Sequence, residues 1–411
     1  MTGEQTIALA DVFVALLVAL AIVALVTRRF GVPYTAALVV FGLIVAVVTP
    51  PVGVVVTPQL VLAVLVPGLV FEAAFRLDIT HLRPILPAAT ILAGPGVLLV
   101  AGLVAVILSF TTDIPLSSAF LVGAMVSATD PVAVIATMRQ ARAPERLATL
   151  IETESLFNDG TGIVLFAIAL QSAAPLSEGV VSFVATIGVS VAVGLVLGGV
   201  AAWIGGRIDD INLELTLTII AAYGIYLLAD RLHESGIIAT VVAGIVIGNY
   251  GRQTGMSARS RIAIDTVWSY IAFLLTAIVF LLVGLTVTLG DLAAATLPIA
   301  WGLVAVLIGR AIVVYGLLGG LGRIPSRFTA GLRLPLDWSH VLFWSGLRGA
   351  IAVALALSLP QELPDRALLQ GTVFGIVLFT LLVQGTSAGL VVRRFAGEAA
   401  KGPDTATSQI R

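Results

Sequence analysis

The chain has 411 residues, of which 59% are hydrophobic and only 11% are charged, and its mean hydropathy is +1.11. This composition exceeds what a soluble core requires and indicates a polytopic membrane protein. The net charge of −1 and the absence of a basic run give no reason to expect a nucleic acid partner, and the zero cysteines exclude disulfides, thiolate metal sites and thiol catalysis.

Apolar stretches separated by short loops with Arg, Asp, Gly or Pro predict thirteen transmembrane helices. The first stretch has no basic region before it and no clear cleavage site after it, so we expect it to remain as a span. The predicted helices cover residues 7–27, 32–49, 59–75, 85–110, 116–140, 147–170, 179–205, 213–229, 236–250, 262–289, 295–319, 336–359 and 367–392.

The basic residues fall unevenly on the two sides of this arrangement. Of the 22 Lys and Arg residues, 18 lie on one side, Arg231 and Arg366 lie on the other, and Arg310 and Arg348 lie within spans. One missed or additional helix would scramble this partition, so the asymmetry supports the count of thirteen. By the positive-inside rule, the N-terminus is expected outside the cell and the C-terminus in the cytoplasm.

An odd number of helices allows two halves of opposite orientation. Six helices, one linking helix and six further helices form two inverted repeats, as in inverted-repeat transporters. The predicted helices 116–140 and 336–359 hold corresponding places, and both are interrupted by Gly, Pro or charge, in SATDPVAVIA (127–136) and SGLRGAIAVA (345–354). We therefore expect an all-α fold in which the fifth and the twelfth helix are broken.

The interruption of the fifth helix contains Asp130 and Pro131, which follow Ser127 and Thr129. Proline removes a backbone donor and clashes with the preceding turn, so the helix is expected to unwind near Thr129. The carbonyl groups freed in this way can bind a cation. In a soluble protein the same TDP sequence would be typical of a helix start, but here it lies in the middle of a long apolar span.

The sixth predicted helix carries the polar segment ESLFNDGTG (154–162) within an apolar run. Residues four apart lie about 40° apart around a helix, whereas residues five apart diverge by about 140°. Ser155 and Asp159 therefore share one face, with oxygen atoms that suit a hard cation. Glu154 and Asn158 share the other face as a hydrogen-bonded pair that requires a buried cationic partner, for which Arg310 and Arg348 are the candidates.

A charge balance follows from these positions. Asp130 can lie among the positive N-terminal ends of broken half-helices, and Arg348 can lie among the negative C-terminal ends. Arg310 can pair with Glu154, which leaves Asp159 without a protein counter-charge. Such a carboxylate must hold a proton or a metal cation. Competition of two cations for one carboxylate is an exchange mechanism.

Glu72, near the end of the third predicted helix, has two interpretations. It is either an interfacial residue that faces Arg76 or an outer ligand or gate on the vestibule of the ion site. Asp265, Glu214 and His340 lie at helix ends and are expected to be solvated.

Four segments together resemble the sodium/proton antiporters of the NhaP and eukaryotic sodium/proton exchanger type. They are SATDPVAV, ESLFNDGTGIVLF, GRAIVVY and SGLRGAIAVALAL, in the order of that family and spread over nearly the whole chain. The resemblance implies a homodimer in which each protomer has a core domain and a dimerisation domain. It also implies that the fifth and the twelfth helix cross at their breaks and that transport follows an elevator-like alternating-access cycle.

The resemblance also implies roles for individual residues. Asp159 is the ion-binding carboxylate, Ser155 and the Thr129 carbonyl are further Na⁺ ligands, and Glu72 reaches the ion directly or through water. The Asn158–Asp159 pair is similar to that of the electroneutral exchangers. The structural polar triad of the family corresponds to Glu154, Asn158 and Arg310.

These observations predict a secondary transporter that exchanges Na⁺ or Li⁺ for H⁺ in a 1:1 ratio across the cell membrane, without a cofactor. Residues 1–394 are expected to form one transmembrane unit and residues 395–411 a short cytoplasmic tail. The core is assigned to the fourth to sixth and eleventh to thirteenth helices, and dimerisation to the first to third and seventh to tenth. Alternatives are a K⁺/H⁺ antiporter, a channel, and an intramembrane aspartyl protease that uses Asp130 and Asp159.

Overall fold

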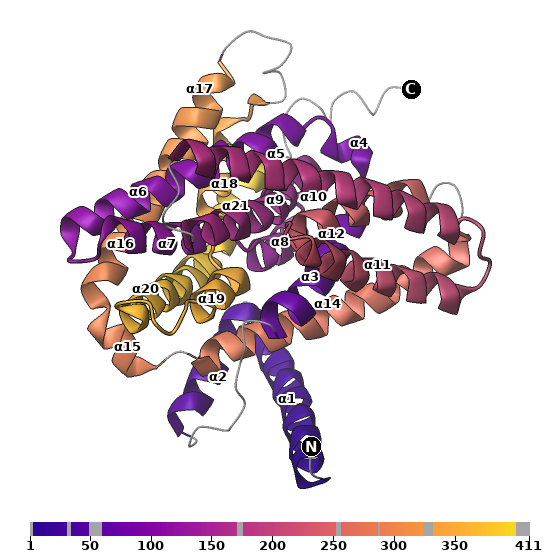
Figure 1. The fold of residues 1–411 in the computed structure, drawn as a ribbon, viewed down its shortest axis with the longest axis horizontal. Coiled ribbons are helices and arrows are strands. Elements are labelled where there is room, and N and C mark those ends of the chain that lie inside the picture. Colours follow the sequence, from indigo (N-terminus) through magenta and orange to yellow (C-terminus); the bar gives the residue numbers. More distant parts are fainter. Residues whose placement is uncertain are drawn as a thin grey trace.

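The computed structural model describes residues 3–30, 34–48, 60–170, 176–251, 256–286, 288–323 and 332–399. Within those ranges the secondary structure consists of helices, as Figure 1 shows. Seven helical segments, some of which contain a kink or a break, are long and apolar enough to cross a membrane. The structure is thus that of an all-helical membrane protein.

The helices of the first part of the chain, in which η denotes a π-helical segment, are α1 (Gly3–Phe30), α2 (Tyr34–Val48), η1 (Leu60–Leu65), α3 (Val66–Arg76), α4 (Ile79–Leu82), α5 (Leu86–Ala93), α6 (Pro95–Thr111), α7 (Leu116–Ser127), α8 (Val132–Gln140), α9 (Glu145–Leu170) and α10 (Leu176–Gly205). Those of the second part are α11 (Ile211–Arg231), α12 (Gly236–Val246), η2 (Ile247–Gly251), α14 (Ala258–Thr286), α15 (Leu289–Ala294), α16 (Thr296–Ala311), η3 (Ile312–Leu318), α17 (Gly319–Leu321), α18 (Leu336–Trp344), α19 (Ala350–Leu357), α20 (Arg366–Phe379), η5 (Thr380–Gln384) and α21 (Gly385–Ala399).

The predicted spans coincide with these helices, but several of them are not continuous. The span predicted over 85–110 is divided into α5 and α6 at Gly94, because Pro95 has no N–H to continue the helix and Gly94 takes a non-helical conformation (φ −98°, ψ −89°). The spans over 59–75, 236–250, 295–319 and 367–392 each contain a π-helical segment.

Several predicted boundaries are shifted by a few residues, and two of the shifts change how the chain is divided. The helix predicted over 262–289 ends at Thr286, and the short helix α15 starts at Leu289 because the Thr288 side chain accepts a hydrogen bond from the Asp291 N–H and caps it. The last helix, predicted to end at residue 392, continues as α21 to Ala399. The predicted tail over 395–411 therefore begins inside a helix, and residues 400–411 lie outside the described part of the chain.

Both predicted interruptions are present. The helix over 116–140 is broken between α7 and α8, and the helix over 336–359 is broken between α18 and α19. The two breaks meet, because the Asp130 N–H donates a hydrogen bond of 2.8 Å to the Leu347 carbonyl. The two broken helices thus share a backbone contact at their non-helical segments.

Small residues allow two pairs of helices to approach closely. A Cβ on Gly123 of α7 would clash with the Ala101 carbonyl of α6, and a Cβ on Gly284 of α14 would clash with the Val39 carbonyl of α2. Such backbone-to-backbone contacts are the usual way in which helices pack in a lipid environment, where apolar surface alone gives no driving force.

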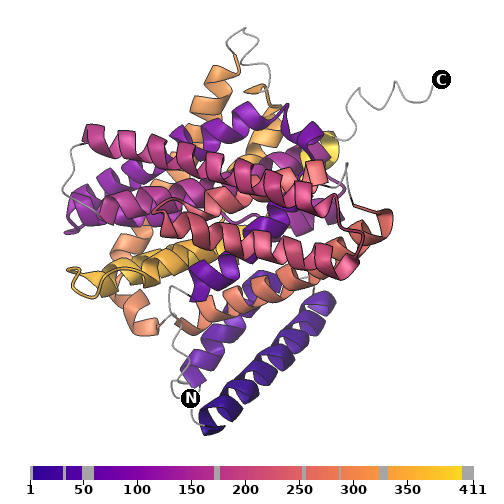
Figure 2. The same ribbon diagram turned by 45° about the vertical axis from the view of Figure 1, so that its right-hand side comes forward.

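In Figures 1 and 2, α1 lies beside α2 at the edge of the bundle.

Candidate functional site

The non-helical segment between α7 and α8 is held in place by α9. Asn158 accepts a hydrogen bond of 3.0 Å from the Thr129 N–H and donates one of 2.7 Å to the Thr129 hydroxyl. The Ser155 hydroxyl donates a hydrogen bond to the Thr129 carbonyl. The predicted unwinding near Thr129 is therefore present, and two side chains of the ESLFND segment satisfy the backbone groups that it frees.

Glu154 turns away from this segment and pairs with Arg310 of α16. Arg310 Nη1 donates to Glu154 Oε1, and Nη2 lies 2.9 Å from Oε2 and 2.8 Å from the Leu342 carbonyl. Both side chains are buried. Of the two candidates, Arg310 is thus the partner of Glu154. The prediction that Glu154 and Asn158 form a hydrogen-bonded pair is wrong, because both hydrogen bonds of the Asn158 amide are made with Thr129.

The other buried arginine, Arg348, lies at the C-terminal end of α7. Its Nη1 donates hydrogen bonds of 3.1 and 3.2 Å to the Ser127 and Ala128 carbonyls, and its backbone N–H donates to the Thr380 hydroxyl at 3.0 Å. The last carbonyl groups of a helix carry partial negative charge, so they stabilise the guanidinium without a carboxylate.

Asp130 occupies the complementary position. Its Oδ1 accepts a hydrogen bond of 3.0 Å from the Val132 N–H at the start of α8. Gly349, which precedes α19, lies so close that a side chain there would overlap Asp130. The carboxylate thus faces the positive ends of two half-helices, as the charge balance predicts.

The contact between Gly349 and Asp130 provides a test of how the two helix breaks pack against each other. Replacing Gly349 with Ala is expected to lower stability by about 1–3 kcal/mol, because the new Cβ would force Asp130 out of position. The melting temperature in detergent measures the effect. Gly102→Ala in α6 is the control, since a Cβ there would meet no described atom within 4 Å and should cost nothing. Equal melting temperatures for both variants would show that Asp130 does not need its position beside Gly349.

Asp159 faces a cavity of about 420 Å³, which is also lined by Thr129, Asp130, Ser155 and Glu72. The cavity lies between α8, α9 and α19 on one side and α3 and α14 on the other. Within the described part of the chain, no group forms a hydrogen bond or an ion pair with the Asp159 carboxylate. Asp159 is therefore a carboxyl group in the membrane interior that has no hydrogen-bond or ion-pair partner among the described residues, and the Asp130 carboxyl group lines the same cavity.

Glu72 lines the same cavity but is paired. Its Oε1 lies 2.6 Å from Arg76 Nε one turn further along α3. Of the two interpretations of Glu72, the structure thus shows the contact with Arg76, and its role as an ion ligand stays a prediction.

Sequence reasoning missed Glu152, which also lines the cavity and pairs with Arg139. Its spacing of three and seven residues from Ser155 and Asp159 was the signal that could have identified it, because this spacing places all three on one face of a helix.

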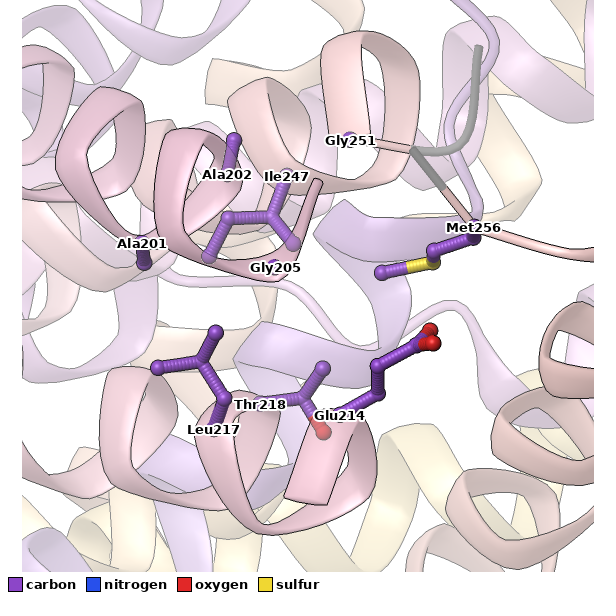
Figure 3. A pocket seen from close by; sticks show the side chains of 9 residues that line it. All are labelled: Ala201, Ala202, Gly205, Glu214, Leu217, Thr218, Ile247, Gly251 and Met256. Carbon is purple, nitrogen blue, oxygen red and sulfur yellow. The ribbon is translucent and has the colours of Figure 1, made fainter. Parts of the chain in front are cut away.

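The expectation that Glu214 is solvated is wrong. Its side chain is 1% exposed, and Oε1 accepts a hydrogen bond of 3.2 Å from the Ser260 hydroxyl, while Oε2 has no partner. Figure 3 shows it beside Met256, at a separate cavity of about 10 Å³, which is room for about one water molecule. The start of α14 folds over this helix end, and the sequence gives no sign of that packing. No residue of this small cavity belongs to the cavity at Asp159.

Comparison with known proteins agrees with this geometry. Residues 13–394 match the family described as sodium/hydrogen exchanger, transmembrane. The chain is 37% identical over 367 residues to the low-affinity Na⁺/H⁺ antiporter NhaS1 of Synechocystis sp., covering 88% of this chain and 69% of the relative. It is 38% identical over 350 residues to the Na⁺/H⁺ antiporter NhaP of Pseudomonas aeruginosa, covering 81% of this chain and 80% of the relative.

The fold is similar to that of the sodium proton antiporter MjNhaP1 from Methanocaldococcus jannaschii at pH 8. The TM-score is 0.80 at 20% sequence identity, over 96% of this chain and 100% of that structure. A family match over nearly the whole length, relatives above 30% identity and a shared fold lead to one conclusion: the chain belongs to the sodium/hydrogen exchanger family.

Proposed function

We propose that this protein exchanges Na⁺ or Li⁺ for H⁺ across the cell membrane, and that Asp159 binds either the metal cation or the proton. The observation that carries the proposal is the contrast among the buried charges. Glu154 has Arg310, Arg348 has two carbonyl groups and Asp130 has helix N-termini, whereas Asp159 has a cavity and no described partner. The relatives named as Na⁺/H⁺ antiporters support the same exchange.

The Thr129 carbonyl and the Ser155 hydroxyl supply further oxygen ligands. In this structure the Ser155 hydroxyl donates its hydrogen to the Thr129 carbonyl. When Na⁺ binds, the hydroxyl turns so that its lone pairs, with the carbonyl and the Asp159 carboxylate, face the ion. When Asp159 takes a proton instead, the hydrogen bond forms again. Glu72 completes the ligand set through water or after it leaves Arg76.

The proposed transport cycle rests on hydrogen bonds and ion pairs that each stay on one side of the cavity. Hydrogen bonds tie the broken helices to α9, so α7 to α9, α18 and α19 move as one unit. The pair of Glu72 and Arg76 stays within α3, and the pair of Arg139 and Glu152 joins α8 to α9, so neither pair crosses the cavity. These contacts support an elevator movement of the core against the side that holds α3 and α14.

We further propose that the chain has thirteen spans in two inverted repeats and that its N-terminus lies outside the cell. We also propose that the protein is a homodimer, formed by the part that includes α10 and α11. Exposed apolar side chains such as Val184 and Val196 of α10 suit lipid or a second protomer. Because the family consists of transporters, the alternative of an aspartyl protease is set aside.

The proposal predicts electroneutral 1:1 exchange. If Asp159 is the sole carrier group, the loaded site has the same charge in both directions, so the membrane potential does no work on the cycle. It would contribute about 2.3 kcal/mol per elementary charge per 100 mV if net charge crossed. Initial rates in proteoliposomes, with potassium and valinomycin clamping the potential at zero and at about −100 mV, should therefore be equal.

A prior measurement with potassium alone shows whether K⁺ is itself a substrate. Exchange of K⁺ in place of Na⁺ would favour the K⁺/H⁺ alternative, and conductance without proton counterflow would favour a channel. A several-fold change in rate on clamping would contradict electroneutrality and require a second titrating group, with Glu72 as the first candidate.

The competition of Na⁺ and H⁺ for Asp159 also determines how the exchange rate depends on pH. At low pH, protons displace Na⁺ from Asp159, and at high pH the return step lacks protons, so the rate should peak between the two limits. A higher Na⁺ concentration should move the acid limb to lower pH.

A further inference from the structure

The solvent-exposed end of the cavity at Asp159 carries an ion pair that joins α8 to α9 and that has so far been given no role in binding the cation. Arg139 Nη2 of α8 lies 3.4 Å from Glu152 Oε1 of α9. The Arg139 side chain is 67% exposed and that of Glu152 is 31% exposed, so solvent reaches the pair. Both residues line the cavity together with Asp159.

Glu152 lies on the face of α9 that leads to the ion site. Glu152, Ser155 and Asp159 are spaced i, i+3 and i+7, which places them in one row along the helix. The rise of 1.5 Å per residue separates the Cα atoms of Glu152 and Asp159 by about 10 Å. A cation that enters from the exposed end therefore passes Glu152 before it reaches Asp159.

Arg139 is a loose partner for this carboxylate. It lies on the cavity-facing row of α8 with Val132, Ile135 and Ala136. Exposed ion pairs gain little in water, because both groups are solvated and the long side chains lose freedom when they meet. Arg139 thus reduces the negative potential at the cavity mouth without holding Glu152 permanently.

We propose that Glu152 is a positioning residue for the transported cation: its carboxylate raises the concentration of Na⁺ at the cavity mouth and lowers the KM for Na⁺, and Arg139 opposes this effect. The inference rests on the proposed Na⁺/H⁺ exchange at Asp159. At a separation of about 10 Å near a protein surface, one unit charge changes the affinity for a monovalent cation about twofold to tenfold. The effect decreases with salt, since the Debye length is about 10 Å at 0.1 M.

The test compares four variants in proteoliposomes: Glu152→Gln, Arg139→Gln, the double variant, and Glu145→Gln as the control. Glu145 is the first residue of the same helix, is 79% exposed and is not among the residues that line the cavity. The KM for Na⁺ and the maximal rate are measured at alkaline pH, where protons do not compete. Choline chloride varies the ionic strength.

We expect Glu152→Gln to raise the KM about twofold to tenfold and Arg139→Gln to lower it by a similar factor, with maximal rates close to that of the wild type. The double variant restores the charge balance of the mouth and should return the KM close to the wild-type value, as should Glu145→Gln. At high ionic strength the differences should shrink.

Two results would overturn the inference. If both single variants lower the maximal rate and the melting temperature, and the double variant does not recover, the pair only ties α8 to α9. An unchanged KM in every variant also contradicts it. Failure of the proposed function is recognised separately, because the wild-type protein would then show no Na⁺-driven proton flux in the same vesicles.

Discussion

Replacing Asp159 with Asn is expected to abolish exchange of Na⁺ and Li⁺ while the fold is retained. Asn has nearly the same shape as Asp, but it cannot supply the negative charge that a metal cation needs, and it cannot take up and release the proton. No described residue forms a hydrogen bond or an ion pair with the Asp159 carboxylate, so the substitution breaks no side-chain contact. Na⁺-driven proton efflux from proteoliposomes, followed with a pH dye, measures the loss.

A second measurement separates binding from transport. A ligand that binds the folded state raises the melting temperature, so Na⁺ should stabilise the wild-type protein at alkaline pH and should not stabilise the Asp159→Asn variant. Asp113→Asn, a change of the same kind at an exposed position between α6 and α7, is the control and should behave as the wild type. Robust Na⁺-driven efflux by the Asp159→Asn variant would mean that the ion site lies elsewhere.

Replacing Arg310 with Ala is expected to cost roughly 3–5 kcal/mol of stability, because the buried Glu154 carboxylate loses both of its hydrogen bonds to the guanidinium. Replacing both members, with Glu154→Gln and Arg310→Met, should cost less, since no charge remains without a partner. The melting temperature in detergent should therefore rank the wild type first, the double variant second and Arg310→Ala last.

Arg231→Ala provides the matched control, because Arg231 lies exposed at the end of α11 and its loss strands no buried charge. If Arg310→Ala melts at the wild-type temperature but transports more slowly, the arginine acts in the transport step. The structural role would then belong to Arg348.

Residue spacing predicts much of the site, because the membrane restricts where polar groups can lie. The helix breaks follow from Pro131 and from the Gly–Leu–Arg–Gly segment at 346–349, and the positions of Asp130 and Arg348 follow from half-helix dipoles. The spacing of residues along α9 is enough to separate the Asp159 face from the Glu154 face. These inferences depend on local geometry and on the cost of unpaired charge.

Contacts between distant helices cannot be predicted in the same way. The choice of Arg310 over Arg348 for Glu154 depends on where α16 lies relative to α9, which the spacing within either helix does not determine. A shared helix face suggests that Asn158 pairs with Glu154, but the Asn158 amide instead donates to the Thr129 hydroxyl and accepts from the Thr129 N–H. The place of Glu214 at a helix end suggests a solvated side chain, whereas its burial depends on which segment covers that end.

The bond between the two helix breaks also bears on local unfolding. An unwound segment inside a membrane helix would ordinarily be the place where the chain opens most easily, since its amides lack partners within the helix. Here the Thr129 amide is bonded to Asn158 and the Asp130 amide to Leu347, which lies in the other break. Opening one break therefore requires the other to lose a bond as well. The two breaks therefore open together or stay closed. The backbone around Thr129 is thus already ordered before the cation binds, so binding does not have to order it.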